Sequence, residues 1–274
     1  MRLLAVLIFV MLHLVLLGQE DVQVRSKEIE SQGKKLYRSE MASWHGTDIF
    51  LEKFPQHRSN FSAYFSYEDT KGVHCIFYSK ANEPKVLATI SFDETFSPDK
   101  VVIDGTTRDF TVFEKETYLL RKAAANLVQT DSFFRHYNNT NFNIVPMVEQ
   151  NEKKVYVLTG TSQQGVVMFG NDYLLTFDLE NQLVSKMALH KSLIPIKYGK
   201  EIEGESIAAM HSHLPELGEL ITPTDICTLM LYQNLTKWKQ HIVISKNFVS
   251  IWTAAENKLL TLSREAWEKI QGSK

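Results

Sequence analysis

Hydrophobic and polar positions along the chain predict strands in two stretches and helices between and after them. From Phe61 to Phe92, the aromatic and β-branched runs SAYFSYED, VHCIFYSK and KVLATISF are separated by the turn-forming sequences DTKG and KANEP. This pattern predicts a small antiparallel sheet. Residues 113–135 carry apolar residues at helical spacing and predict a long helix. Strand signals return in VYVLTG, VVMFG, YLLTFD and VSKMALH, which predict a meander or a series of hairpins.

The last part of the chain predicts a second mixture of strands and helices. A short apolar strand, SIAAM, leads directly into His211. Thr222 as N-cap and Pro223 at the first helical position predict a helix that ends near Trp238. The runs HIVIS and FVSIWTA predict two strands, and residues 264–271 a final helix. The fold class expected is therefore α+β, with a β-rich N-terminal region over residues 19–105 and a sheet flanked by helices over residues 106–274.

The first eighteen residues, MRLLAVLIFVMLHLVLLG, have the parts of a secretory signal peptide: an early Arg2, an apolar run and a small residue, Gly18, before a polar stretch. The alternative is an uncleaved membrane anchor, because the run approaches the length that spans a bilayer. We expect residues 1–18 to be a signal peptide and the protein to be exported, to a periplasm or to the outside of the cell. Residues 19–40 are charged, lack apolar periodicity and are expected to form a solvated leader.

Composition narrows the classes of function and partner. The formal net charge is -2, which gives no electrostatic reason to expect a nucleic acid or an anionic membrane surface as partner. No stable membrane insertion is expected after cleavage of the signal peptide. The chain has two cysteines, Cys75 and Cys227, and we expect two buried thiols. The oligomeric state is open.

The sequence around the predicted SIAAM strand carries the candidate chemistry. Side chains two positions apart on a strand point to the same face, so His211 and His213 could share a metal ion. Asp225 falls in the first turn of the helix capped by Thr222, close to the end of that strand. Two imidazoles and a carboxylate, with a fourth position left to water, form a catalytic zinc arrangement. Without a metal, the histidines would be structural and Asp225 would serve only the helix dipole.

The run HSHLPELGELITPTD resembles the JAMM/MPN-type metalloprotease motif, which is His-x-His, seven residues, Ser, two residues and Asp; here eight residues separate His213 from Thr222. The resemblance implies that His211, His213 and Asp225 are zinc ligands. It also implies that Thr222 takes the place of the serine that supports the tetrahedral intermediate. The order strand, His-x-His, loop and capped helix matches as well, so residues 106–274 are expected to form a JAMM-like domain.

The resemblance further implies an upstream glutamate as general base, just before the first core strand that follows a helix. In this chain that strand is VYVLTG, and the preceding segment offers Glu149 and Glu152. A carboxylate near a metal site can accept a proton and pass it to a leaving amine. Either residue could equally be a solvated turn residue. His190, after MALH, could approach the same pocket, although a surface histidine is the simpler interpretation.

Taken together, these patterns predict an exported zinc-dependent amide-bond hydrolase of peptidase or isopeptidase type, with a peptide or protein as substrate. A non-catalytic exported binding module with a degenerate or structural metal site is the main alternative. A plain structural protein is a third reading, and it would be favoured if the two histidines faced opposite sides of the sheet or if Asp225 lay far from them.

Overall fold

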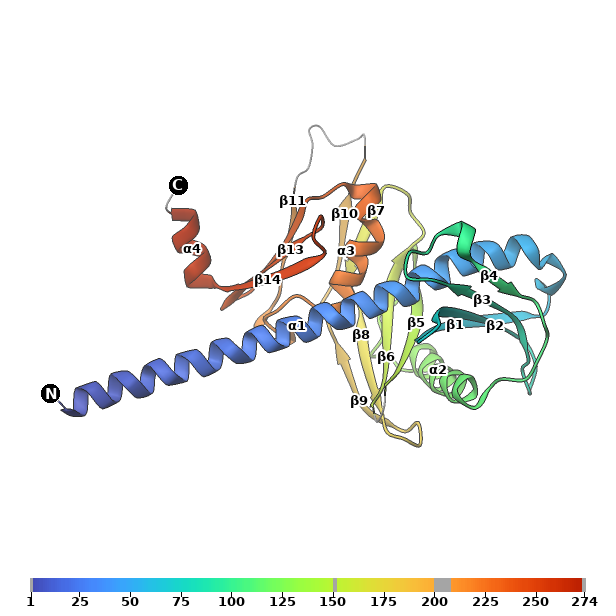
Figure 1. Ribbon diagram of the computed structural model, residues 1–274, viewed down its shortest axis with the longest axis horizontal. Coiled ribbons are helices and arrows are strands. Elements are labelled where there is room, and N and C mark those ends of the chain that lie inside the picture. The colour runs from blue at the N-terminus through green and yellow to red at the C-terminus, as the bar shows by residue number, and fades with distance from the viewer. Residues whose placement is uncertain (1, 150–151, 200–207, 273–274) are drawn as a thin grey trace. The chain divides into compact units, whose positions relative to one another are not determined.

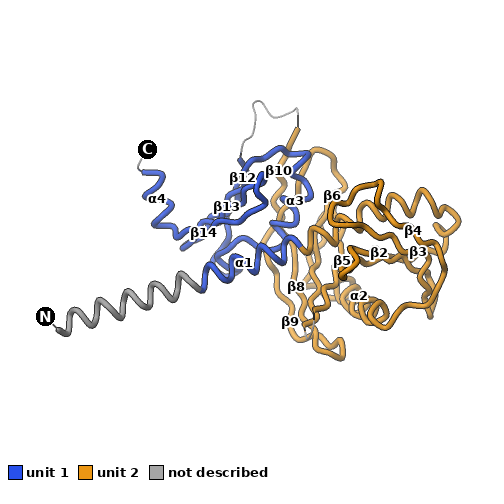
Figure 2. The backbone as a smooth tube through the Cα atoms, in the orientation of Figure 1, with its two compact units in different colours: residues 1–34, 202–274 blue, residues 35–201 orange. Residues whose placement is uncertain are grey.

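The computed structural model describes residues 2–149, 152–199 and 208–272, with side chains described from residue 21 onward. Over these residues the chain forms four α-helices and fourteen strands in four sheets, so the expected α+β class is confirmed (Figure 1). The chain divides into two compact units, which Figure 2 distinguishes by colour. Unit 1 combines residues 1–34 with residues 202–274, and unit 2 is residues 35–201. These limits differ from the expected boundaries at residues 18 and 105.

The first helix, α1 (Arg2–Lys53), contributes residues to both units. The expectation of a solvated leader over residues 19–40 is wrong, because this segment is helical and buries side chains such as Val22 and Leu36. In this segment, charged residues alternate with the small and apolar residues that pack on neighbouring elements. The buried side of the helix therefore has no clear apolar periodicity in the sequence. No helix among the described residues is both long and apolar enough to cross a membrane. The signal peptide over residues 1–18 stays a prediction.

Unit 2 begins with an antiparallel sheet in the order β1-β2-β3-β4, as the aromatic runs predicted. Its strands are β1 (Phe61–Asp69), β2 (Gly72–Ser79), β3 (Val86–Phe92) and β4 (Val102–Asp104). The part of α1 that belongs to unit 2 packs on this sheet through Ala42 and Phe50, and the Phe50 ring stacks on Phe77 with centroids 4.3 Å apart. Short 3₁₀ turns lie at Pro55–His57 and Pro98–Lys100.

The second sheet of unit 2 has the order β5-β6-β8-β9. Its strands are β5 (Thr140–Glu149), β6 (Glu152–Thr161), β8 (Tyr173–Phe177) and β9 (Leu183–Ala188). The helix α2 (Val112–Thr130) buries Leu120, Ala124 and Val128 against it, which confirms the predicted long helix. The predicted meander is only partly correct, because β7 (Val166–Gly170) leaves this sheet and pairs with β10 (Leu193–Lys197). Adjacent hydrophobic runs do not reveal which strand pairs with which.

Unit 1 contains a four-stranded sheet in the order β11-β12-β13-β14. Its strands are β11 (Ala208–Ser212), β12 (Gln240–Ile244), β13 (Phe248–Thr253) and β14 (Lys258–Ser263), followed by helix α4 (Arg264–Gly272). β11 is parallel to β12, and α3 (Pro223–Thr236) forms the crossover between them. The predicted strands and helices of this region are therefore confirmed where the structure describes them, while residues 206 and 207 of the predicted SIAAM strand lie outside the described residues. Cys75 in unit 2 and Cys227 in α3 are both buried thiols, as expected.

Residues 21–34 of α1 complete unit 1. Ser26 Oγ donates to Thr261 Oγ1 at 2.8 Å on β14, and Glu30 accepts from the backbone N–H of Leu259 at 2.9 Å. Gly33 allows α1 to approach α3 closely, because a Cβ atom at this position would lie 2.6 Å from Cβ of Ile226. That distance is shorter than real Cβ contacts, so only glycine permits this packing. The close packing fixes the first turn of α3, where the candidate ligand Asp225 lies.

Candidate metal centre

The pair of histidines lies where β11 ends. His211 is paired in register with Val243 of the parallel strand β12. The backbone N–H of His213 donates to the carbonyl of Ile244 at 3.0 Å, so the extended backbone continues one step beyond the strand. The two side chains therefore share one face of the sheet, as their spacing predicted. Both are buried, and their Nε2 atoms lie 3.0 Å apart.

Asp225 is held in position by a capping box at the start of α3. The hydroxyl of Thr222 accepts from the backbone N–H of Asp225 at 3.1 Å, and the backbone N–H of Thr222 donates back to Asp225 Oδ2 at 2.9 Å. Thr222 Oγ1 also donates to Oδ2 at 2.8 Å. The Asp225 side chain, with the residue only 1% exposed, is thereby fixed in one orientation. The structure gives Thr222 the role of positioning this carboxylate; its predicted role toward a tetrahedral intermediate stays a prediction.

These three side chains converge on one point. His211 Nε2 lies 3.7 Å from Asp225 Oδ1, and His213 Nε2 lies 3.5 Å from Asp225 Oδ2. With zinc–ligand bonds near 2.05 Å, two ligand atoms of a tetrahedral site are about 3.3 Å apart. The distances in the structure, 3.0 Å, 3.5 Å and 3.7 Å, bracket this value. The group of buried side chains that contains His211, His213 and Asp225 could therefore hold a metal ion.

The other nitrogen of each imidazole has a partner that orients the ring. His213 Nδ1 lies 2.9 Å from the carbonyl oxygen of Leu220, so it must carry the proton and donate it. This tautomer leaves the Nε2 lone pair directed at the centre of the group, which is the arrangement that metal-bound histidines use. The loop that supplies this carbonyl is itself fixed, because the N–H of Ile221 donates to Ser250 Oγ at 3.2 Å.

His211 is oriented by a third histidine that the sequence analysis did not identify. His241 lies on β12 in register with Ala209, so its ring shares the face of His211. Its Nε2 lies 2.8 Å from His211 Nδ1. Burial, together with the neighbouring His211, lowers the pKa of His241 to about 3, so this ring is neutral near pH 7. The available signal was a single histidine near the start of the otherwise apolar run HIVIS.

Two proton arrangements fit the positions of the three histidines, one suited to a bound cation and one to the site without a cation. In the first, His211 Nδ1–H donates to His241, and both Nε2 lone pairs of the ligand pair are available to a cation. In the second, His241 Nε2–H donates to His211, and His211 Nε2–H donates to His213 Nε2 at the observed 3.0 Å. Both arrangements contain the same number of protons, so a metal ion would take the place of the hydrogen bond between the two Nε2 atoms while the ring protons of His211 and His241 move from Nε2 to Nδ1.

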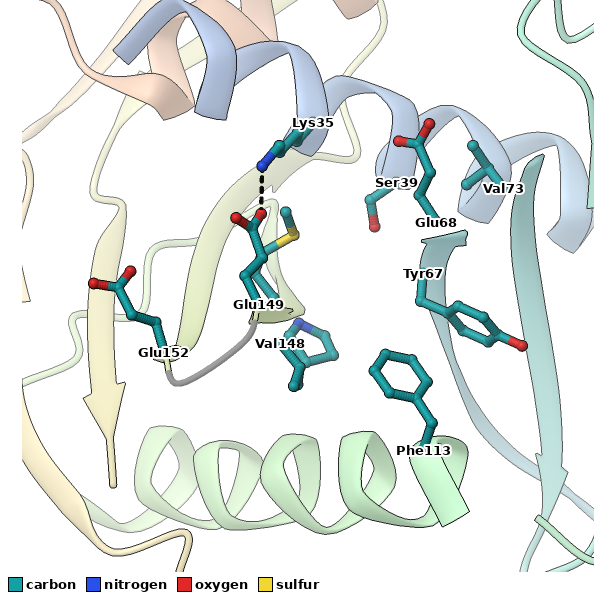
Figure 3. Close-up of a pocket in the computed structure, with 11 residues that line it drawn as sticks. Lys35, Ser39, Tyr67, Glu68, Val73, Phe113, Val148, Glu149 and Glu152 are labelled. Carbon is teal, nitrogen blue, oxygen red and sulfur yellow. Dashed lines mark hydrogen bonds and ion pairs between the residues drawn. The ribbon is translucent and has the colours of Figure 1, made fainter. Parts of the chain in front are cut away.

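The two candidate general bases, Glu149 and Glu152, lie in unit 2, whereas His211, His213, Asp225 and Thr222 come together in unit 1. Both glutamates line a cavity of about 700 Å³ (Figure 3). Glu149 forms an ion pair with Lys35 at 2.7 Å. Glu152 pairs with Lys154 at 2.5 Å, and that hydrogen bond lowers the pKa of Glu152. The role of either carboxylate as a base stays a prediction.

His190 also lies in unit 2, and it is buried rather than on the surface, which corrects the simpler of its two interpretations. Its Nδ1 is 3.7 Å from Asp172 Oδ2. Asp172 in turn accepts the backbone N–H of Thr159 through Oδ1 at 2.8 Å. The 3.7 Å between Asp172 and His190 is too long for a hydrogen bond, so the two residues are buried neighbours.

Comparisons with known proteins add no further information. No protein-family model matches the sequence, and neither the curated proteins nor the solved structures gave a match. The expected relation to JAMM/MPN-type metalloproteases therefore stays a prediction from the sequence between His211 and Asp225.

Proposed function

We propose that the protein binds one zinc ion through His211, His213 and Asp225 and hydrolyses amide bonds of a peptide or protein. The observation that carries the proposal is the convergence of two Nε2 atoms and one carboxylate at tetrahedral spacing, with the other nitrogen of each imidazole oriented by a partner. Zinc, when bound to such a set, polarises a carbonyl group and makes water a nucleophile near neutral pH.

The residues of the chain have separate roles in this proposal. His211 and His213 provide neutral nitrogen ligands, because their Nδ1 protons can be directed to His241 and to the Leu220 carbonyl. Asp225 provides the negative charge, and Thr222 holds that carboxylate at the edge of the site. Either Glu149 or Glu152 would accept a proton from the attacking water and transfer it to the leaving amine. Export from the cytoplasm would make peptides or secreted proteins the substrates.

A second function is favoured by one specific observation. Both candidate bases are engaged with lysines, Glu149 with Lys35 and Glu152 with Lys154, and the hydrogen bond from Lys154 lowers the pKa of Glu152, which makes it a weaker proton acceptor. A module that binds metal but hydrolyses nothing would need no base. The two functions can be told apart by replacing a glutamate. Only in the hydrolase should the replacement lower turnover while the zinc content stays the same.

The test measures hydrolysis of a broad library of peptides by mass spectrometry, with protein that has been stripped of metal and then reloaded with one equivalent of zinc. The proposal predicts cleavage by the reloaded protein and none by the stripped protein or by the His211→Ala/His213→Ala variant. Glu149→Gln or Glu152→Gln should reduce cleavage by about 100-fold or more at unchanged zinc content. Full zinc content without any cleavage would support the non-catalytic module instead.

A further inference from the structure

Unit 2 contains a second cavity, of about 680 Å³, that is independent of the proposed metal centre. It lies between the ends of β1 and β2, the turn that follows β2, and one face of α2. Its volume is within the range of small-molecule sites. Three cationic side chains line it, Lys80, Arg121 and Lys122, and no acidic side chain does.

The cavity in Figure 3 has a lining of different charge from that of the cationic cavity. There, one cationic side chain, Lys35, lies among three glutamates, Glu68, Glu149 and Glu152, and it forms an ion pair with Glu149. In the cationic cavity, none of the three positive side chains forms an ion pair with any residue that the structure describes. Like charges gathered in one concave site repel each other and raise the potential there. An anion bound among them would relieve that repulsion.

Arg121 has hydrogen-bond donors left over. Its Nη1 donates to the hydroxyl of Tyr78 at 3.2 Å. Its Nε is buried and has no hydrogen-bond partner among the described residues. A guanidinium has five N–H donors in a planar fork that matches the oxygens of a phosphate or carboxylate group. The Nε atom is closed off from solvent, so the donors that a bound anion can reach are those of Nη2 and the second N–H of Nη1, which have no acceptor among the described residues.

One acidic residue, Glu40, interacts with Arg121 electrostatically without forming an ion pair with it. The two residues line a small adjoining cavity. The Glu40 carboxylate accepts its hydrogen bond from Asn143 Nδ2, at 2.7 Å, rather than from the guanidinium. Lys122 is placed over the face of Tyr118, 5.9 Å from the ring centroid, which holds its ammonium group beside the cavity.

We propose that this cavity binds a small anion with at least two negative charges on phosphate or carboxylate groups. Arg121 donates hydrogen bonds to one oxyanion group in the plane of its guanidinium, and Lys80 and Lys122 neutralise the remaining negative charge of the anion. Ser62, Ser79 and Gln129 of the same lining supply neutral hydrogen-bond donors. The proposal does not depend on the proposed zinc hydrolase activity, because every group it uses lies in unit 2.

The test is calorimetric titration of the full chain with pyrophosphate and, separately, with citrate, at low salt. The His211→Ala/His213→Ala variant is titrated in parallel, since both anions also chelate metal ions. We expect one equivalent to bind with the same affinity to both proteins. Arg121→Gln should weaken binding at least 10-fold, and Lys80→Gln or Lys122→Gln about 3-fold to 5-fold each. Tighter binding of pyrophosphate would assign phosphate, and tighter binding of citrate would assign carboxylate.

Lys71→Gln is the matched control. Lys71 is an exposed residue just before β2 and Lys80 lies just after it, so the eight residues of the strand separate the two by roughly 25 Å. Removal of its charge should leave the affinity unchanged. The proposal is overturned if the parent shows no saturable binding of either anion, or if Lys122→Gln and Arg121→Gln bind as tightly as the parent. Because Lys122 is exposed, its variant tests the site even if Arg121→Gln is poorly folded.

Discussion

Helices α2 and α3 both begin with a capping box, but the acidic residue of the box has a different partner in each helix. In each, a threonine N-cap and an acidic residue three positions later form a capping box: Thr111 with Glu114, and Thr222 with Asp225. Both acids are 1% exposed. Glu114 faces Arg108, whose Nη1 and Nη2 donate to its two oxygens at 2.6 Å and 2.7 Å. Asp225 faces the imidazoles of His211 and His213.

The difference lies in the source of the compensating charge. A buried carboxylate is costly unless a positive charge or several hydrogen bonds stabilise it. An arginine is always charged, so the pair in α2 is permanent and structural. A neutral imidazole can donate a hydrogen bond to a carboxylate, but it supplies a compensating charge only when it is protonated or when both groups share a metal ion. The same sequence signal, a threonine followed by an acid, thus marks a structural pair in one unit and a candidate metal centre in the other.

The largest expected effect is that of metal removal on unit 1. A ligand present at about 1,000 times its dissociation constant stabilises the state that binds it by about 4 kcal/mol. Stripping zinc with a chelator should therefore increase hydrogen exchange in β11 and in the first turn of α3 and leave exchange in α2 unchanged. Hydrogen exchange with mass spectrometry checks this. Equal exchange with and without chelator throughout unit 1 would mean that no metal stabilises it.

Glu40 is a third buried carboxylate, but among the described residues it has neither an arginine as ion-pair partner, as Glu114 has, nor a place in the candidate metal centre, as Asp225 has. Burial raises the pKa of Glu40 to about 7. Since the folded pKa is above the ordinary value of 4.5, the folded protein binds the proton more tightly. Stability should then fall as pH rises from about 4.5 to 7, by about 3 kcal/mol in total. Glu40→Gln should remove this loss and be more stable than the parent at pH 8, whereas Glu83→Gln, at an exposed turn, should not. Urea unfolding at pH 5 and pH 8 measures both; a parent with equal stability at the two pH values would refute the assignment.

The structural role of the α2 pair predicts a smaller effect of Glu114→Gln. The variant keeps the shape of the side chain but leaves Arg108 without its charge partner. We expect a loss of about 2 kcal/mol in the free energy of unfolding, moderated by the partial exposure of Arg108. Zinc content should not change. Loss of metal in this variant would show that the two helix starts are not independent, contrary to the account.

The smallest expected effect comes from the two caps themselves. Thr111→Ala and Thr222→Ala should each lower stability by about 1 kcal/mol, as loss of an N-cap does. Thr222→Ala should in addition weaken zinc binding by about 10-fold, because its hydroxyl positions a ligand. Paired unfolding curves and zinc titrations of both variants check this. If both threonines affected zinc equally, or neither did, the positioning role of Thr222 would be wrong.

The sequence predicted local features well and long-range ones poorly. The capped helix after Thr222, the shared face of His211 and His213, and the nearby Asp225 all follow from spacing within a few residues. His241 comes from another strand, and only the parallel pairing of β11 with β12 brings it to His211. The buried face of residues 21–34 escaped prediction for the same reason, since its partners lie on β14 and α3 at the other end of the chain.

Elemental analysis of protein purified without chelators tests for the metal centre directly, with Asp225→Asn and Glu114→Gln measured beside the parent. Asparagine can still accept the hydrogen bonds of the cap, so the first variant removes the ligand charge and spares the helix. We expect about one zinc ion per chain in the parent and in Glu114→Gln, and almost none in Asp225→Asn. A folded parent without metal, or the same metal content in all three proteins, would contradict the proposed metal centre.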